Sequence, residues 1–259
     1  MKIAYCISGQ MRNFDHPVVV KRLKKYILDP LQPDVFIDTW DDQRGSSYYS
    51  IHNNLWVPQN PNEPPDIDKV KEIFNPTVLQ TENFAEWKSN LKNPLYLKCP
   101  QMKQNSAILF YKMWRANKLK SDYEKEHGFK YDVVIKSRAD IIFFRTLKEE
   151  WLNGKFWTNN NGPIMHDVFL TGNSDIMDTA SDLWNHLPFY FASVNSAPPM
   201  LTNWCRDKGL KWNAFPQNEL LEVYRTDADL KNPALIEYFK RHQPDKLQDW
   251  YDYLKKEDL

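Results

Sequence analysis

The sequence YDVVIKSRADIIFF, residues 131–144, decides the fold of this chain. Its first part, Tyr131 to Ile135, leaves no polar face, which is typical of a strand covered on both sides at the centre of a parallel sheet. Lys136, Arg138 and Asp140 then interrupt the apolar run. The stretch therefore predicts a central strand that carries charged side chains where it ends.

The start of the chain predicts that this strand belongs to an α/β fold. Residues 2–8 (KIAYCIS) form a short apolar run that ends before Gly9, and residues 33–40 (PDVFIDTW) form another. Between them, apolar residues recur at helical spacing over residues 18–28, with lysines on the opposite side. A strand, a helix and a strand in this order predict a parallel pair joined by a right-handed crossover. We expect a Rossmann-type, mostly parallel central sheet flanked by helices.

Further helices and strands follow along the chain. Asp66 is placed to cap a short helix over residues 66–75, and a long amphipathic helix is predicted over residues 102–126. The remaining predicted elements are strands at residues 77–82, 156–159 and 167–172, and a helix at residues 174–187 that an aspartate helps to cap.

The length and the local composition predict the domain organisation. The 259 residues are enough for one large domain, and they contain no internal repeat. Residues 41–66, which are rich in Pro, Asn and Ser, are predicted to be a loop or lid insertion. Residues 226–259 are predicted to form peripheral C-terminal helices. We therefore expect a single domain over residues 1–259.

The charge and the cysteines narrow the choice of partners and compartment. Lys and Arg number 34 and Asp and Glu number 34, so the net charge is zero. The overall charge therefore does not indicate a nucleic acid as partner. No apolar run approaches the roughly 20 residues of a membrane span, and the apolar part of the N-terminus is too short for a signal peptide. Cys6, Cys99 and Cys205 are widely spaced, which favours a reducing compartment. We expect a cytoplasmic protein.

Polar residues follow three of the predicted strands, at what should be one edge of one sheet. They are Gly9, Gln10 and Arg12 after the first strand, Asp38, Thr39 and Trp40 at the end of the second, and Arg138 and Asp140 after the central strand. Ligands of open α/β sheets bind beyond the carboxyl ends of the strands. A carboxylate there can hold a divalent cation that bridges two phosphates, and an arginine can bind a phosphate oxygen or a sugar hydroxyl. The pattern favours a phosphorylated ligand.

The motif around Arg138 and Asp140 has a second interpretation. Residues i and i+2 of an extended backbone point the same way, so the two side chains should share a side. An ordinary ion pair at the strand end explains this as well as a ligand site does. The chain has neither a GxGxxG nor a GxxxxGK[ST] pattern, so a Rossmann dinucleotide site and a P-loop lack support.

Four motifs, taken in order, resemble one family. ISGQMRNF, DVFIDTW, YDVVIKSRADIIFF and HDVFLTGNSDIMD are similar to segments of small GT-A-type glycosyltransferases, which occur in bacterial surface-polysaccharide clusters and in large DNA viruses and phages. The resemblance covers roughly residues 1–225. It implies a nucleotide-sugar donor site on a Rossmann-like sheet, with a glycan or another hydroxyl compound as acceptor.

The resemblance also assigns roles to the charged residues. SRAD stands in the place of the family's DxD-like motif, so Asp140 corresponds to the carboxylate that binds Mn²⁺ or Mg²⁺ and the diphosphate. Arg138 stands where many members have the first acid, and an arginine can itself neutralise diphosphate charge, so the need for a metal stays open. Gly9, Gln10, Arg12 and the residues Asp38 to Trp40 are implied to line the donor site.

The segment HDVFLTG, residues 166–172, resembles the acceptor side of such enzymes. Asp167 is the candidate general base or acceptor-hydroxyl contact, and capping of a turn before the next strand is the alternative. His166 is read as structural. Glu219 is a possible second acid, with helix capping as its alternative.

Other functions remain compatible with the sequence. Tyr48, Tyr49 and Trp56 are candidates for a lid over the site, although packing explains aromatic residues equally well. A non-catalytic nucleotide- or carbohydrate-binding relative of the same fold is the main alternative to a transferase. A nucleotidyltransferase is a weaker one, because its usual Gly-rich or paired-acid pattern is missing.

Overall fold

The computed structural model describes residues 1–42, 48–50, 55–57, 63–90, 101–159, 163–191, 194, 196–215 and 220–223. The chain divides into two compact units, Met1–Glu222 and Val223–Leu259. The fold described below is that of the first unit. The helices predicted over residues 226–259 and most of the predicted insertion at residues 41–66 lie outside the described residues.

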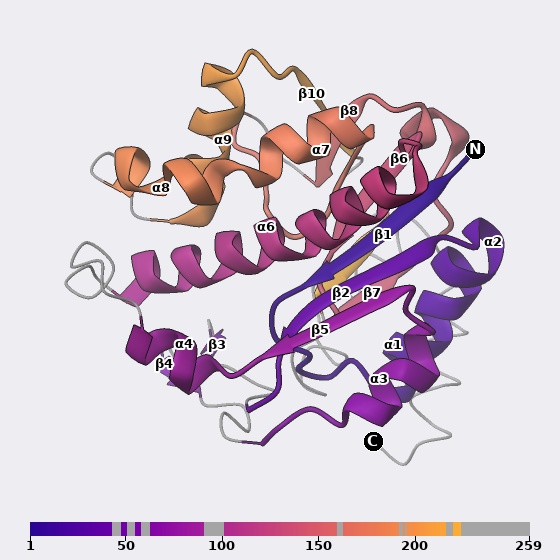
Figure 1. Cartoon of the computed structure of the whole chain (residues 1–259), viewed down its shortest axis with the longest axis horizontal. Helices are drawn as coiled ribbons and strands as arrows, with labels where there is room; N and C mark the ends of the chain where they lie inside the picture. The colour runs from indigo at the N-terminus through magenta and orange to yellow at the C-terminus, as the bar shows by residue number, and fades with distance from the viewer. Residues whose placement is uncertain are drawn as a thin grey trace. The chain divides into compact units, whose positions relative to one another are not determined.

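A seven-stranded sheet forms the centre of the first unit, in the order β10-β8-β9-β6-β1-β2-β5 (Figure 1). Its strands are β1 (Ile3–Ser8), β2 (Asp34–Trp40), β5 (Val78–Glu82), β6 (Val133–Ser137), β8 (Phe156–Asn159), β9 (Leu170–Gly172) and β10 (Trp212–Phe215). Strands β1, β2, β5 and β6 are parallel neighbours, whereas β9 runs antiparallel to β6 and β8. The predicted mostly parallel α/β sheet is confirmed.

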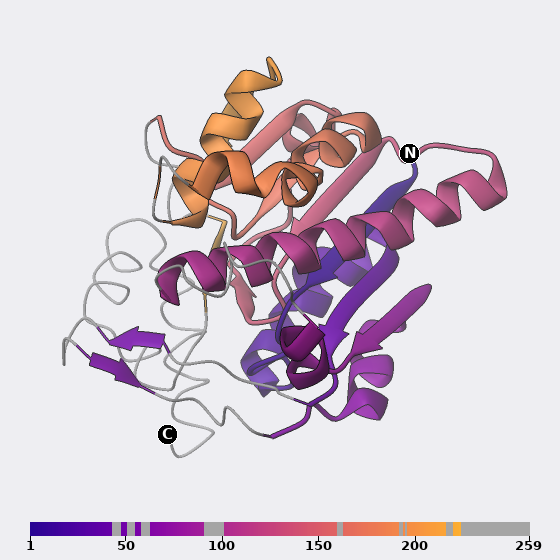
Figure 2. The same ribbon diagram turned by 60° about the vertical axis from the view of Figure 1, so that its left-hand side comes forward.

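Helices cover both faces of this sheet (Figures 1 and 2). One face carries α1 (Pro17–Leu23), which continues through the π-helical turn η1 (Lys24–Leu28) into α2 (Asp29–Leu31), and α3 (Ile67–Phe74). The other face carries α6 (Gln101–His127), α7 (Ser174–Ser181), α8 (Leu183–Phe191) and α9 (Ala197–Asp207). As predicted, Asp66 caps α3, and its carboxylate accepts a hydrogen bond from the backbone N–H of Lys69.

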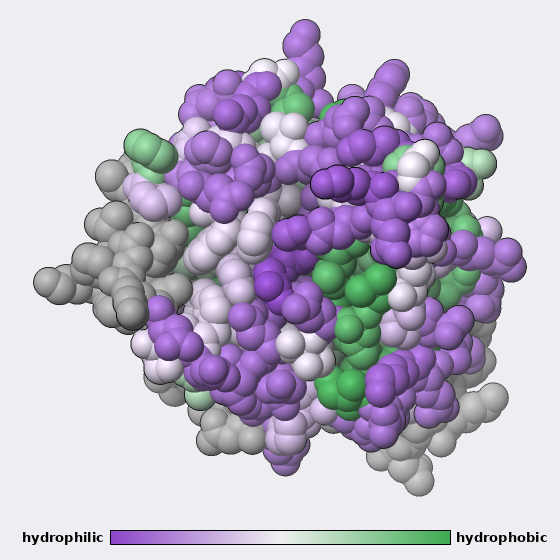
Figure 3. Space-filling model, in the orientation of Figure 1, coloured by the Kyte–Doolittle hydropathy of each residue, from purple (hydrophilic) through white to green (hydrophobic). Residues whose placement is uncertain are grey.

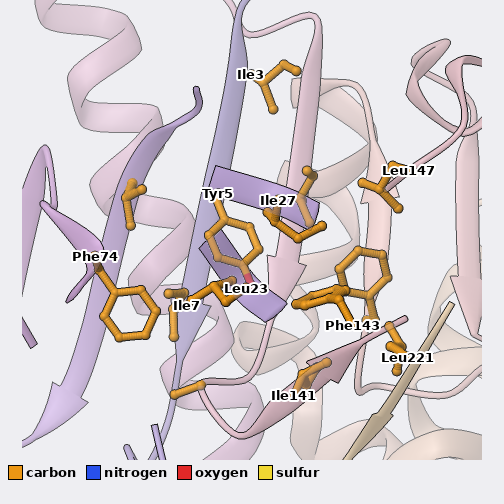
Figure 4. Close-up of a cluster of buried hydrophobic side chains, with 14 of the residues drawn as sticks. Ile3, Tyr5, Ile7, Leu23, Ile27, Phe74, Ile141, Phe143, Leu147 and Leu221 are labelled. Atoms are coloured by element: carbon orange, nitrogen blue, oxygen red, sulfur yellow. The ribbon is translucent and has the colours of Figure 1, made fainter. Parts of the chain in front are cut away.

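The alternation of side chains along each strand supplies both cores. Tyr5 and Ile7 of β1 point to the α1 face, where they pack in a cluster that includes Leu23 and Ile27 (Figure 4). Cys6, between them, points to the opposite face and packs in the cluster that holds Met113 of α6. Both faces of β1 are therefore buried, as a central parallel strand requires.

The edge of the sheet at β5 is less covered than its centre. Val78 and Leu79 of β5 are half-buried. On the face drawn in Figure 3, hydrophilic side chains predominate, and an apolar strip lies below α6 in the region of β2 and β5.

Among the described residues, no helix combines the length and the apolar character needed to cross a membrane.

The order of the strands places a switch point between β1 and β6. From β1 the chain continues to β2 and β5 on one side, and it then returns to β6 on the other side of β1. The helix that follows β1 covers one face of the sheet, and the helix that precedes β6 covers the other. In open α/β sheets, the carboxyl ends of two such strands flank the crevice in which ligands bind.

Three parts of the structure differ from the sequence prediction. Residues 131–144 do not form one strand, because β6 ends at Ser137 and a separate strand, β7 (Ile141–Phe143), pairs with β11 (Leu221–Val223). The helix predicted at residues 174–187 is two helices that meet at Asp182, and the capping residue is Asn173 rather than an aspartate. Elements that the sequence did not predict are α4 (Phe84–Asn90), the 3-10 helix η2 (Glu149–Leu152), α9, β10 and the hairpin of β3 (Tyr48–Ser50) and β4 (Leu55–Val57).

Candidate functional site

Two arginines and one aspartate meet at the switch point. Arg138 donates from Nε to Oδ1 of Asp140 at 2.8 Å and from Nη2 to Oδ2 at 2.6 Å. Arg12, in the turn after β1, donates from Nη1 to Oδ2 of the same carboxylate at 3.2 Å. The predicted shared side of Arg138 and Asp140 is thus a direct bidentate ion pair, and a residue from the neighbouring strand end joins it.

The carboxylate of this cluster is buried, whereas the side chains of its two arginines are partly exposed. The side chain of Asp140 is 1% exposed, compared with 15% for Arg138 and 20% for Arg12. Burial acts to lower the pKa of Arg138, but Asp140 and Asp167 raise it by more, so the guanidinium stays charged. With Asp140 ionised, the three groups carry one net positive charge at the carboxyl edge of the sheet. Such a surface is suited to an anion.

The backbone of the turn after β1 is unusual. Gly9 has a φ of 98° and Arg12 a φ of 43°, and both values are positive. Glycine adopts such values without cost, whereas for arginine they are uncommon and often mark functional segments. The N–H of Gly9 donates to the backbone carbonyl of Asp38 at 3.1 Å, which ties the end of β1 to the end of β2. Gln10 lies in the same turn.

Lys136 is a charged residue to which the sequence gave no role. It lies in β6 with 3% of its surface exposed, and its ammonium group donates to the backbone carbonyl of Asp167. Burial lowers the pKa of Lys136 to about 8, and the nearby charge of Arg138 also lowers it. Asp167 and Asp140 act in the opposite direction and raise the pKa. The candidate base Asp167, itself 8% exposed, is therefore held beside the arginine cluster through its main chain. The sequence signal that could have indicated this role is the position of Lys136 within a strand that is otherwise apolar on both faces.

We expect Lys136 to make stability depend on pH. Its pKa is lower in the folded protein than in the unfolded chain, so the unfolded state binds more protons between about pH 8 and the ordinary value of 10.5, and stability rises with pH over that window. The difference in unfolding free energy between the wild type and Lys136→Met should change by as much as about 3 kcal/mol across it. Urea denaturation at several pH values measures this difference. If the difference in unfolding free energy between the two proteins does not vary with pH, the lowered pKa of Lys136 is contradicted.

Asp38 lies in a different ionic cluster. Its side chain is 0% exposed and accepts from Nζ of Lys112 at 2.6 Å and from Nε of Arg115 at 3.1 Å. Lys112 also donates to the backbone carbonyl of Thr39 at 3.0 Å and to Glu82 at 3.2 Å. Burial raises the pKa of Asp38. The charges and hydrogen bonds of Lys112 and Arg115 act in the opposite direction, but the effect of burial is larger. The carboxylate that was expected at the donor site thus joins β2 to α6.

Trp40 belongs to the same cluster. Its buried ring lies 3.7 Å from Nζ of Lys112, and it packs against Phe84, Trp87 and Tyr111. Its indole N–H has no hydrogen-bond partner in the structure as described. These contacts place Trp40 in a satellite aromatic core.

A divalent cation does not fit the described surroundings of Asp140. Both carboxylate oxygens already accept hydrogen bonds from guanidinium groups. Among the residues that the structure describes, no group of three or more His, Cys, Asp or Glu is arranged to hold a metal ion. We therefore assign no chemical step to a metal.

Several residues with expected roles are not described in full. Glu219 lies outside the described residues. For Tyr48, Tyr49 and Trp56 the structure describes the backbone of β3 and β4 and not the side chains. Cys6 and Cys205 are free and buried, and Cys99 lies outside the described residues.

Two sequence comparisons bear on the identity of this chain. No protein-family model matches the chain, and no curated protein matches it significantly. The fold and the cluster at the switch point are therefore the observations from which a function is proposed.

Proposed function

We propose that this protein is a glycosyltransferase that moves a sugar from a nucleotide-diphosphate donor to a hydroxyl group of a glycan or another acceptor. One observation carries the proposal. Two arginine side chains, from the turn after β1 and from the end of β6, meet at the switch point of an open α/β sheet, and both are partly exposed. This is where such sheets bind nucleotides, and guanidinium groups match the geometry of phosphate oxygens.

In this proposal the chemistry is mainly electrostatic. A bond forms between the acceptor oxygen and the anomeric carbon while the bond from that carbon to the diphosphate breaks, and negative charge develops on the leaving nucleoside diphosphate. Arg12 and Arg138 stabilise that charge, and a protein environment with little water strengthens the effect. The acceptor hydroxyl gives its proton to a base, for which Asp167 is the candidate beside the cluster.

A non-catalytic nucleotide-binding protein of the same fold is the second candidate. The observation that favours it is the 8% exposure of Asp167, which limits the access of an acceptor hydroxyl to the carboxylate. Calorimetry and turnover of the same nucleotide sugar separate the two candidates. A binding protein would bind the donor without releasing nucleoside diphosphate, and Asp167→Asn would leave its affinity unchanged.

Binding of nucleoside diphosphates tests the proposal. We expect one of UDP, GDP, CDP and dTDP to bind the wild type in isothermal calorimetry, and Arg138→Ala to weaken that binding at least about tenfold, because a hydrogen bond to a charged group contributes about 1.5–3 kcal/mol. Arg206→Ala is the matched control, since Arg206 is exposed and bonds Asn203 within α9. Failure of all four nucleotides to bind the folded protein would contradict the proposal.

A further inference from the structure

We infer that the donor site works without a divalent cation, with Arg12 and Arg138 supplying the positive charge and Asp140 acting as the residue that positions them. This inference rests on the proposed function, and it changes the role of Asp140. The carboxylate orients two guanidinium groups toward the diphosphate instead of coordinating a metal that bridges the phosphates.

The hydrogen bonds of Asp140 carry the inference. The described hydrogen bonds to its two oxygens include two from the fork of Arg138 and one from Arg12. A metal ion on the same oxygens would have to displace this fork. It would also stand a few ångströms from two guanidinium charges in a buried setting, where water screens repulsion weakly. Because the Asp140 side chain is only 1% exposed, the approach of a hydrated ion is costly as well.

The two other described acids that were expected at this edge, Asp38 and Asp167, lie beside cations. Asp38, the second acid expected at this edge, is bound by Lys112 and Arg115. Asp167 raises the pKa of Lys136, so the carboxylate and the ammonium attract each other. Within the described ranges, Asp140 does not belong to a group of three or more His, Cys, Asp or Glu residues arranged to hold a metal ion.

The arginines supply positive charge that favours a diphosphate. Arg12, Arg138 and protonated Lys136 carry three positive charges against the two negative charges of Asp140 and Asp167, so one net positive charge remains, and the side chains of both arginines are partly exposed. Two of the five N–H donors of Arg138 bond Asp140, and the planar guanidinium presents the others in a fixed geometry that suits phosphate oxygens, which a lysine ammonium lacks. The shape of the cation should therefore matter as much as its charge.

The experiment compares binding with and without metal. Calorimetry would follow inorganic pyrophosphate and the four nucleoside diphosphates, in EDTA and in millimolar Mn²⁺, while electron paramagnetic resonance follows free Mn²⁺ with the protein alone. We expect binding in EDTA that Mn²⁺ does not strengthen, because Mn²⁺ complexes the phosphates in solution and adds no contact at the site. We also expect Mn²⁺ mixed with the protein alone to stay free in solution. Arg138→Lys should weaken binding about tenfold in EDTA, because it keeps the charge and loses the fork. Arg206→Lys is its control.

Asp140→Asn adds a second readout. The amide keeps the size of the side chain and one acceptor oxygen, so the arginines lose part of their alignment. Binding in EDTA should therefore weaken, and Mn²⁺ should strengthen binding in neither protein. Binding that requires Mn²⁺ and loses this requirement in Asp140→Asn would overturn the inference and leave the proposed function standing. If neither pyrophosphate nor any nucleotide binds under either condition, both are wrong.

Discussion

Replacing Arg12 and Arg138 together by alanine is expected to weaken binding of the nucleoside diphosphate at least about a hundredfold. Each charge-assisted hydrogen bond contributes about 1.5–3 kcal/mol, so two arginines account for about 3–6 kcal/mol. The loss has a second cause, because the double variant leaves the carboxylate of Asp140 without these two partners beside an incoming anion. Calorimetry on the double variant and both single variants measures the loss and its additivity.

The repulsion by Asp140 can be separated from the loss of the arginines. A triple variant that adds Asp140→Asn removes the negative charge, and it should recover part of the affinity that the double variant loses. Circular dichroism and thermal melting establish that each variant is folded. If the double variant is folded and binds within about threefold of the wild type, the diphosphate does not bind at this cluster.

The sequence predicts the centre of the fold well because the strongest patterns lie there. The apolar run before Lys136 has no polar face, and this requires a strand covered on both sides. The long amphipathic pattern of α6 and the β-α-β order at the start are equally local signals. Strands β7, β9, β10 and β11 have three or four residues each, so no period of two can develop, and their pairing depends on partners distant in the chain. Of these four strands, the sequence predicted β9 as part of residues 167–172, and it included β7 only within a single strand over residues 131–144.

The candidate site could be predicted only in part. The proximity of Arg138 and Asp140 follows from their spacing, and the placement of Arg12 near them follows from parallel pairing of β1 and β6. The partners of Asp38 could not be predicted. Lys112 and Arg115 resemble the solvent-facing cations of an amphipathic helix, and only the packing of α6 on β2 shows that Lys112 is buried.

The same limit applies to the network between α6 and α7. Lys120 is fully buried and donates to Glu124 at 3.1 Å, to Ser174 at 2.6 Å and to Asp178 at 2.7 Å. In the sequence these residues look like an ordinary polar face of two helices. Because Lys120 is buried, its ammonium group depends on these three partners, and the network therefore fixes how α7 packs against α6.

Lys112→Met is expected to destabilise the fold by about 3 kcal/mol, toward the lower end of the range for breaking a buried ion pair. The variant leaves Asp38 buried with Arg115 as its remaining cation, and it removes the donor from the Thr39 carbonyl. Lys118→Met is the matched control on the same helix. Lys118 is 50% exposed and pairs with Asp122 at i+4, so its loss should cost about 0.3–0.5 kcal/mol. Urea denaturation of both variants gives the comparison, and equal losses would contradict the role of Lys112.

A double variant decides whether Asp38 serves the fold or the ligand. Removing both partners of a buried ion pair costs less than removing one, so Lys112→Met with Asp38→Asn should recover part of the stability that Lys112→Met loses. If Asp38 only joins β2 to α6, this double variant binds the nucleoside diphosphate as the wild type does. If it is folded and its affinity falls as far as that of Arg138→Ala, Asp38 contacts the donor, and the ligand site extends from the switch point across the ends of both β1 and β2.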